Sequence, residues 1–215
     1  MKICYLANTA VPSTTASAIQ IIKMCESFSK LKHKVLLITS NASNKKVFDF
    51  YGVKSKFKIK KLKRYNKFPL GLKYYLFSLS SIIESLNFKP DIYITRNFFT
   101  SFLLTILGKK NILELHHGIE IESRIVKFIT KNSNFLNYKS LLKLVAITNN
   151  VKNYYQKKFS INANKIIVAP SGTSIENKFL NNFLRNKKRL NIGYFGSLYK
   201  SRGVDLILRL SKIDR

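Results

Sequence analysis

The stretch "KICYLANTAVPSTTASAIQIIKMCESFSKLKHKVLLIT", residues 2–39, decides the fold. It opens on a short apolar run at 2–7 and passes through a loop of small, polar residues. An amphipathic segment at 16–31 follows, and a second apolar run at 34–39 closes the stretch. The apolar side chains of the middle segment recur at helical spacing, at Ile19, Ile22, Cys25 and Phe28. The order strand, helix, strand predicts a βαβ unit.

The same alternation continues along the chain. Further strands are predicted at 91–95, 111–116, 144–148, 165–170 and 190–195, with a weaker, edge-type strand at 57–62. Helical patterns occupy 71–86, 98–107, 120–130 and 150–159. Continuous apolar strands separated by helices are typical of a parallel sheet covered on both faces. We therefore expect an α/β fold, with a Rossmann-like parallel sheet and helices on both of its faces.

A second unit is predicted near the end of the sequence. The stretch "NIGYFGSLYKSRGVDLILRL" (191–210) combines an apolar run, a glycine turn with basic residues and the start of a helix. The polar, basic stretch 176–189 before it is the best candidate for a connection. We expect a first domain over 1–185, and over 186–215 a linker with the truncated start of a second α/β unit of the nucleotide-binding kind.

The charge of the chain is its compositional outlier. Thirty-nine Lys and Arg against 10 Asp and Glu give a net charge of +29. Such an excess is typical of partners such as nucleic acid or an anionic membrane surface. The segment 45–73 concentrates eleven of these cations among aromatic and aliphatic residues. An AT-rich genome also produces a Lys-, Asn- and Ile-rich chain, so a plain solvated basic face stays open beside both partners.

The cysteines and the apolar runs indicate a compartment. Cys4 and Cys25 have no metal-ligand spacing, which favours buried thiols in a reducing cytoplasm. The N-terminal apolar run is too short for a signal peptide, and no stretch reaches 18 apolar residues. We expect a cytoplasmic protein, soluble or peripheral at the inner face of the membrane, with no metal.

The residues that follow each strand are the candidate site, because parallel sheets bind ligands beyond the carboxyl ends of their strands. The most informative segment is "ELHHGIEIE" (114–122). A histidine there can accept a proton from a hydroxyl or donate a hydrogen bond to a sugar. Adjacent strand residues face opposite ways, so we expect only one of His116 and His117 to face the ligand. A rim histidine bonded to a neighbouring carboxylate is the structural alternative.

Two glycine-containing turns are further candidates. "APSGTSIENKF" (169–179) places a Pro-Ser-Gly turn after a strand, which is also the pattern of an ordinary turn. "FGSLYKSRG" (195–203) sets Lys200 and Arg202 between two glycines at a helix start, a pattern that suits a diphosphate. Its spacing matches neither the P-loop nor the dinucleotide fingerprint.

Taken together and in this order, the motifs resemble those of the family 4 glycosyltransferases, which have the two-domain GT-B fold. The similar stretches are "LKHKVLLIT" (31–39), "PDIYITRN" (90–97), "ELHHG" (114–118), "LVAITNNVKNYY" (144–155), "IIVAPSGTSIENKF" (166–179) and "IGYFGSLYKSRGVDLIL" (192–208). The chain departs from the family pattern at Lys32, Thr148, Ser171 and Ser174. The resemblance covers nearly the whole chain.

The resemblance implies a retaining, hexosyl-type transfer of a sugar from a nucleotide-sugar donor, without a cofactor, to a glycan or lipid-linked acceptor in cell-surface polysaccharide synthesis. His116 or His117 would lie near the transferred sugar or the acceptor hydroxyl. The implied acceptor residues are Ser13, Thr14, Ala16 and Ser17 in the loop 8–17, with Arg96, Ser171 and Gly172. The implied diphosphate residues are Gly196, Ser197, Lys200 and Arg202.

The donor half of the family carries a motif of two glutamates separated by seven residues. Past residue 190 this sequence has only Asp205 and Asp214 as acids. We therefore expect the 215-residue chain to be incomplete and inactive alone. The alternative is a non-enzymatic basic domain that binds nucleic acid or a membrane; nucleic acid is the less favoured partner, because none of its recognised sequence signatures is present.

Overall fold

The computed structural model describes residues 1–42, 46–62, 68–172, 193–194, 196 and 203–213. The chain divides into two compact units, Met1–Thr173 and Ser174–Arg215. The predicted domain boundary at residues 185 and 186 lies outside the described residues. In the second unit the structure describes one helix, α7 (Val204–Ile213), which follows Gly203. The predicted strand at 190–195 also lies mostly outside the described residues, and Gly193 and Tyr194 have no strand conformation.

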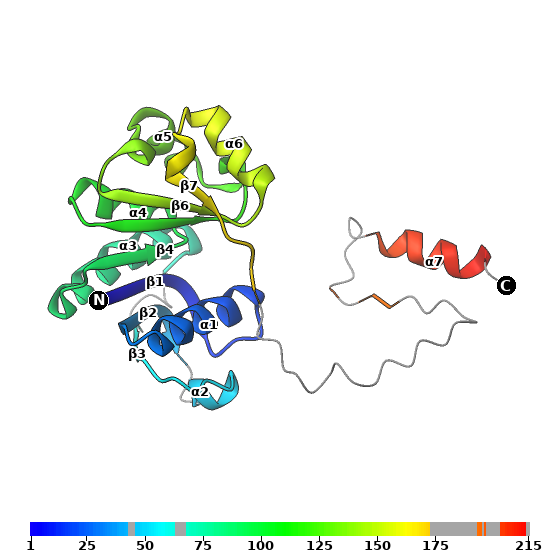
Figure 1. The fold of residues 1–215 in the computed structure, drawn as a ribbon, viewed down its shortest axis with the longest axis horizontal. Coiled ribbons are helices and arrows are strands. Elements are labelled where there is room, and N and C mark those ends of the chain that lie inside the picture. Colours follow the sequence, from blue (N-terminus) through cyan, green and yellow to red (C-terminus); the bar gives the residue numbers. More distant parts are fainter. Residues whose placement is uncertain (43–45, 63–67, 173–192, 195, 197–202, 214–215) are drawn as a thin grey trace. The chain divides into compact units, whose positions relative to one another are not determined.

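The first unit is a seven-stranded, all-parallel sheet with strand order β3-β2-β1-β4-β5-β6-β7 (Figure 1). This arrangement confirms the predicted Rossmann-like α/β fold. The strands are β1 (Lys2–Val11), β2 (Lys34–Ala42), β3 (Lys58–Lys61), β4 (Ile92–Thr95), β5 (Asn111–Leu115), β6 (Leu141–Ala146) and β7 (Ile166–Val168). The α-helices of this unit are α1 (Ala16–Lys30), α2 (Val47–Phe50), α3 (Leu70–Ser85), α4 (Phe98–Ile106), α5 (Arg124–Asn132) and α6 (Asn149–Phe159).

The order of the strands reverses once. From β1 the chain moves outward to β2 and then to β3, and α3 carries it back to β4 on the other side of β1. There Ile3 pairs with Ile92 and Leu6 with Thr95. From β4 onward each new strand is added in the opposite direction. The point between β1 and β4 is therefore the topological switch point, where parallel sheets open a crevice.

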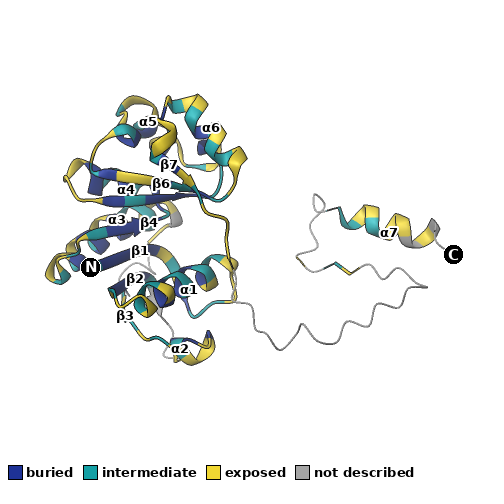
Figure 2. Cartoon of the chain, viewed as in Figure 1, coloured by how far each residue is buried: buried dark blue, intermediate teal, exposed yellow. Residues whose placement is uncertain are grey.

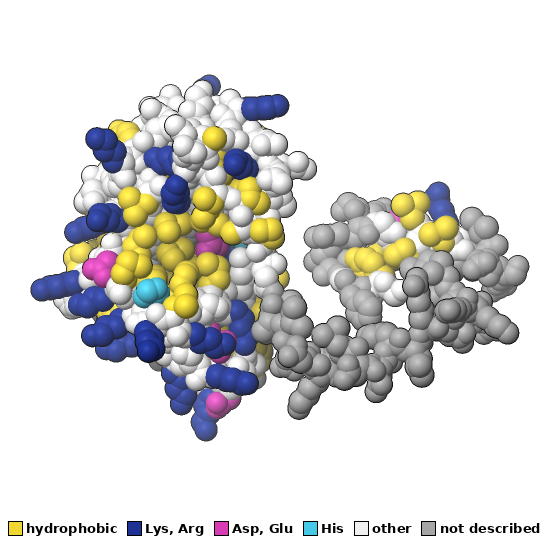
Figure 3. Space-filling view, in the orientation of Figure 1, with side chains coloured by type: hydrophobic (Ala, Val, Ile, Leu, Met, Phe, Trp, Pro, Cys, Tyr) yellow, Lys and Arg dark blue, Asp and Glu magenta, His cyan; other side chains and the backbone are white. Residues whose placement is uncertain are grey.

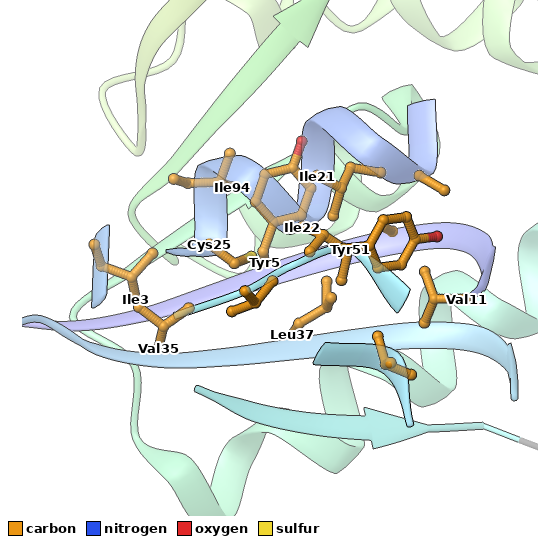
Figure 4. Packing of buried hydrophobic residues seen from close by; sticks show 14 residues of the cluster. Ile3, Tyr5, Val11, Ile21, Ile22, Cys25, Val35, Leu37, Tyr51 and Ile94 are labelled. Atoms are coloured by element: carbon orange, nitrogen blue, oxygen red, sulfur yellow. The ribbon is translucent and has the colours of Figure 1, made fainter. Parts of the chain in front are cut away.

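Alternate residues of β1 serve the two faces of the sheet. Ile3 and Tyr5 pack against Ile21, Ile22 and Cys25 of α1 (Figure 4). Cys4 and Leu6 pack in a second cluster with Phe77 and Ile82 of α3. The central strands are buried along most of their length (Figure 2), as strands covered on both faces must be. Both cysteines are buried and free, as predicted.

The predicted helix at 120–130 is split in the structure. A short 3-10 helix, η3 (Ile119–Ile121), precedes α5, and Glu122 and Ser123 separate the two. The hydroxyl of Ser123 accepts a hydrogen bond from the Val126 N–H at 3.3 Å and caps α5. A serine at this place starts a helix better than it continues one, because its side chain satisfies an N–H that has no partner within the helix. The interruption leaves Glu122 in extended backbone beside the end of β5.

Glu26 is a buried carboxylate of α1. It is 3% exposed, and its oxygens accept from the Lys54 N–H at 2.9 Å and from Lys23 at 3.2 Å, with the Lys30 ammonium 3.3 Å away. Burial alone would raise the pKa of Glu26, but these donors outweigh burial and lower the pKa to about 2. The carboxylate thus ties α1 to the segment that follows α2.

We expect Glu26→Gln to lower the free energy of unfolding at pH 7 by roughly 1–3 kcal/mol, the usual value of hydrogen bonds to a charged group. A lowered pKa stabilises the fold fully above the pKa of an unfolded glutamate, about 4.3, and this stabilisation is lost as the pH falls toward 2. Urea unfolding from pH 7 to pH 2 should therefore show the two proteins converging.

Glu84→Gln is the control for this prediction. Glu84 pairs with Lys60, but both side chains are partly exposed, at 34% and 47%. Ion pairs of this kind contribute about 0–1 kcal/mol. Equal losses in the two variants would contradict the structural role of Glu26.

Candidate functional site

A pocket of about 210 Å³ lies at the switch point, beyond the carboxyl ends of β1 and β4. Its walls come from β1, from the start of α1, from α3, and from the segments that follow β4 and η3. The lining residues are Leu6, Ala7, Asn8, Thr9, Ser17, Ile21, Tyr74, Arg96, Asn97 and Glu122. Most of the polar members belong to segments that follow predicted strands, where the sequence places the candidate site.

A buried carboxylate, Glu114, organises the wall behind the pocket. It is 3% exposed, and its Oε1 accepts a hydrogen bond from the Tyr5 hydroxyl at 2.9 Å. Its Oε2 lies 3.3 Å from Nε2 of His116 and 4.0 Å from Nε of Arg96. Burial and the Glu114 charge raise the pKa of Tyr5, so its hydroxyl stays a donor. Glu114 therefore lies in ion-pair contact with Arg96, which follows the adjacent strand β4, and beside His116, which follows its own strand β5.

His117 contacts a different carboxylate. Its Nδ1 lies 3.0 Å from the Gly118 carbonyl, which can only accept, so Nδ1 carries a proton. Its Nε2 lies 3.7 Å from Oε1 of Glu122, a residue of the pocket lining. Burial raises the pKa of Glu122, while His117 opposes this rise. In the neutral tautomer, Nε2 of His117 can thus accept a proton beside the pocket.

The two predicted histidines therefore have different surroundings. Neither is among the residues that line the pocket. His116 is bonded to Glu114, which matches the structural alternative of a rim histidine held by a carboxylate. His117 lies beside the pocket wall through its contact with Glu122.

The structure brings together only part of the predicted acceptor set. Ser17 and Arg96 line the pocket. Ser13 lies in the loop before α1, held by Tyr51, which accepts from the Ser13 N–H at 2.6 Å and donates to its carbonyl at 2.7 Å. Thr14 in the same loop and Ala16 at the start of α1 are exposed and do not line the pocket. The roles proposed for these residues stay predictions.

The remaining predicted residues lie elsewhere. Ser171 and Gly172 are exposed and follow β7, the edge strand farthest from β3. Gly196 is exposed in the second unit, where a side chain at its position would meet the Tyr194 ring. Ser197, Lys200 and Arg202 lie outside the described residues.

Sequence reasoning did not select Tyr74, Asn97 or Glu122 as individual site residues. Asn97 and Glu122 belong to predicted rim segments, so their positions after strands were the available signal. Tyr74 comes from α3, and no sequence pattern connects it with a rim more than 20 residues away. Only the return of the chain through α3 brings it to the pocket.

The described residues contain neither a metal site nor a membrane span. No group of three or more His, Cys, Asp or Glu side chains in this part of the chain could hold a metal ion. No helix within the same residues is long and apolar enough to cross a membrane.

The fold and the switch-point pocket define a Rossmann-like unit of the GT-B class. The profile described as Glycosyltransferase Family 4 matches residues 17–177, and the chain belongs to that family. No curated protein matches the sequence.

Solved structures show the same fold at low identity. A glycosyltransferase from Rickettsia africae ESF-5 is 17% identical, with a TM-score of 0.53 over 79% of this chain and 42% of that one. A UDP-GlcNAc 2-epimerase from Methanocaldococcus jannaschii is 17% identical, with a TM-score of 0.56 over 78% and 45%. The apo lipopolysaccharide outer core galactosyltransferase WaaB is 16% identical, with a TM-score of 0.53 over 82% and 47%. The chain thus spans less than half the length of each.

We expect Glu122→Gln to raise the melting temperature at pH 7 by a few °C, a shift typical of about 1 kcal/mol in a chain of this size. A raised pKa means that stability is fully present below the pKa of an unfolded glutamate, about 4.3, and is lost as the pH rises through the folded value. The gain from the neutral amide should therefore disappear near pH 4, as followed by thermal unfolding.

Glu120→Gln is the matched control, two residues away. Lys158 and Tyr154 donate to Glu120 and lower its pKa to about 2. Removing this exposed carboxylate should leave the melting temperature at pH 7 unchanged or lower it. A fall in melting temperature with Glu122→Gln would contradict the view that the Glu122 charge is held at a cost.

Proposed function

We propose that this chain is the acceptor-binding part of an enzyme that transfers a sugar from a nucleotide-sugar donor to a glycan or lipid-linked acceptor. The observation that carries the proposal is the switch-point pocket with the His117–Glu122 pair beside it, in a sheet of a glycosyltransferase family. Fold likeness alone does not choose the reaction, since both transferases and an epimerase share it.

The chain's own residues supply defined steps in this proposal. The acceptor binds in the pocket against Ser17 and Arg96, and the proton of the attacking hydroxyl passes to the pair formed by Glu122, which lines the pocket, and Nε2 of His117 beside it. Glu114 is a positioning residue, because it orients Arg96 and His116. Gly196, Lys200 and Arg202 contact the donor diphosphate, where the two cations stabilise the leaving group in place of a metal. The sugar is transferred with retention, and the proposed product class is a cell-surface polysaccharide.

We further propose that transfer needs a donor half in addition to these 215 residues. The three solved structures are each more than twice as long as the part of them that this chain matches. In the proposed enzyme, the 215-residue chain binds the acceptor and requires the additional residues for turnover.

The purified 215-residue chain tests both statements. Saturation-transfer NMR with a panel of mono- and oligosaccharides should detect binding that Arg96→Met weakens by about tenfold, the value of one good charged hydrogen bond. Release of nucleoside diphosphate from UDP- and GDP-sugars should stay at background. Turnover by this chain alone would refute the need for a donor half.

Double-stranded DNA is the comparison ligand. Tight DNA binding with a steep salt dependence, and no saccharide binding, would favour a basic nucleic-acid-binding domain instead. Binding at about 50 mM and about 200 mM salt separates the two outcomes.

A surface of α5 supports peripheral attachment to an anionic membrane. Lys and Arg side chains are scattered over the visible face of the first unit (Figure 3), so charge alone does not identify a docking surface. Three exposed apolar side chains lie here, Ile121 at the end of η3 and Ile125 and Phe128 on α5, and they are 74%, 54% and 69% exposed. Three cations of α5 lie within three residues of them in the sequence, namely Arg124, Lys127 and Lys131. We call these six residues the α5 ridge.

The α5 ridge has the composition of an interfacial helix, with apolar side chains to insert and cations for lipid phosphates. It begins next to Glu122 of the pocket, so a docked ridge would bring the pocket close to a lipid-linked acceptor. Residues 45 and 63–67 of the basic segment 45–73 lie outside the described residues, and the α5 ridge is the described surface that best fits this role.

We expect Phe128→Glu to weaken binding to phosphatidylcholine vesicles containing phosphatidylglycerol by at least about tenfold, because a buried Phe contributes roughly 1.5–3 kcal/mol. Co-sedimentation measures the effect. Ile83→Glu on α3 is the control, since Ile83 is 65% exposed on another helix. Equal losses in the two variants would exclude the α5 ridge as the docking surface.

A further inference from the structure

Hydrogen-bond donors without partners gather at the pocket. In the part of the chain that the structure describes, four buried side-chain polar atoms have no hydrogen-bond partner: Thr39 Oγ1, Tyr74 OH, Arg96 Nη1 and Asn97 Nδ2. The last three belong to residues that line the pocket. Buried polar groups are nearly always paired in folded proteins, and each unpaired one costs free energy. Their concentration in one place indicates a ligand that accepts hydrogen bonds.

Asn97 shows why its donor is left over. The residue is 7% exposed, and its Oδ1 accepts from the Thr100 N–H at 2.9 Å as the cap of α4. Its own N–H donates to Thr95 Oγ1 at 3.1 Å. The cap requires an acceptor oxygen, so the amide cannot be turned around, and Nδ2 remains without a partner. The fold uses one end of the amide and leaves the other for a ligand.

Arg96 is divided in the same way. Its Nε faces Oε2 of Glu114 at 4.0 Å, whereas its Nη1 is buried without an acceptor. Glu114 itself is occupied, because the Tyr5 hydroxyl and His116 take up its oxygens. A guanidinium with a buried, unpaired N–H on a residue that lines the pocket suits a carboxylate or phosphate.

The N-termini of two helices also lie at the pocket. α4 begins at Phe98, directly after Asn97, and α1 begins at Ala16, next to the lining residue Ser17. α1 has no side-chain cap hydrogen bond and no acid in its first turn. The first N–H groups of a helix lack internal partners and carry partial positive charge. Both helix N-termini therefore favour a negative ligand near the unpaired donors of Arg96 and Asn97.

Glu122, the carboxylate among the described residues that line the pocket, opposes this preference weakly. Its side chain is 15% exposed, and burial raises its pKa, which disfavours its ionised form. His117 is its neighbour at 3.7 Å. The donors of Arg96 and Asn97 thus outweigh the negative charge of Glu122, and the pocket still favours a negative ligand.

We infer that this pocket binds an oxyanion, a carboxylate or a phosphate, carried by the acceptor saccharide. Its volume of about 210 Å³ is below the roughly 300–1,000 Å³ of sites for drug-sized ligands. It therefore takes one sugar ring with its charged substituent, and not a whole nucleoside diphosphate. The assignment of the oxyanion to the acceptor saccharide rests on the proposed function, whereas the preference for an oxyanion rests on the pocket alone.

Calorimetric titration of the 215-residue chain with glucuronate, glucose, inorganic phosphate and UDP at physiological ionic strength tests this inference. Glucuronate should bind at least about tenfold more tightly than glucose, a difference of one charged hydrogen bond, and phosphate should compete with it. Asn97→Asp is the decisive variant. Aspartate caps a helix as well as asparagine does, so the fold is kept while the free donor becomes an acceptor.

Asn97→Asp should keep the melting temperature and weaken glucuronate binding by about tenfold or more. Arg96→Met should do the same to binding. Lys157→Met, an exposed site on α6, removes one cation as Arg96→Met does and should change nothing, which controls for attraction to the net charge.

The outcomes separate this inference from the proposed function. Glucose binding as tightly as glucuronate would overturn the oxyanion site and leave sugar transfer standing. Phosphate binding that depends on Asn97, without binding of any saccharide, would support the oxyanion site and overturn its acceptor role. UDP as the tightest ligand, lost with Asn97→Asp, would overturn the acceptor assignment in favour of the donor. Binding indifferent to both pocket variants would overturn the inference entirely.

Discussion

The pairing of β1 with β4 is the constraint on which the rest of the first unit depends. β1 is the first strand of the chain and yet has neighbours on both sides, so the chain must build outward in one direction and then return. The return through α3 creates the switch point, because the loops after β1 and β4 leave toward opposite faces of the sheet. The polar residues that line the pocket belong to segments that meet at the switch point. The buried carboxylate Glu114 of β5 lies behind them.

The periodic parts of this architecture follow from the sequence. Strand and helix patterns place the elements to within a few residues, because a covered parallel strand must be apolar throughout and a helix must repeat its apolar side chains. Ser17 and Arg96, which the family resemblance implies as acceptor residues, line the pocket, and their role in binding stays a prediction. What the pattern misses are single hydrogen bonds. The Ser123 cap divides a predicted helix and so exposes Glu122 to the pocket, and the return of α3 brings in Tyr74.

The scarcity of acids makes their positions informative. The sequence has 10 Asp and Glu against 39 Lys and Arg, so cations are available almost anywhere and mark no particular site. Three glutamates are nevertheless mostly buried. Glu26 ties α1 to the segment after α2, Glu114 braces Arg96 and His116, and Glu122 stands beside His117. Burying a carboxylate costs free energy unless donors surround it, so each of these places is supported by specific partners.

Arg96 and Asn97 each serve the fold and the pocket with different atoms, and this division limits how the pocket can change. At Arg96 the ion pair with Glu114 and the proposed contact with the ligand need the same charge. A neutral residue at position 96 would take the cation away from Glu114 as well as from the ligand. At Asn97 the cap needs only an oxygen, which aspartate, serine or threonine also provides. Selection can therefore alter the charge preference of the pocket at position 97 without loss of the helix, while position 96 stays tied to the buried carboxylate. Within this unit, the residue after the arginine is where the proposed oxyanion preference can change while the cap of α4 is kept.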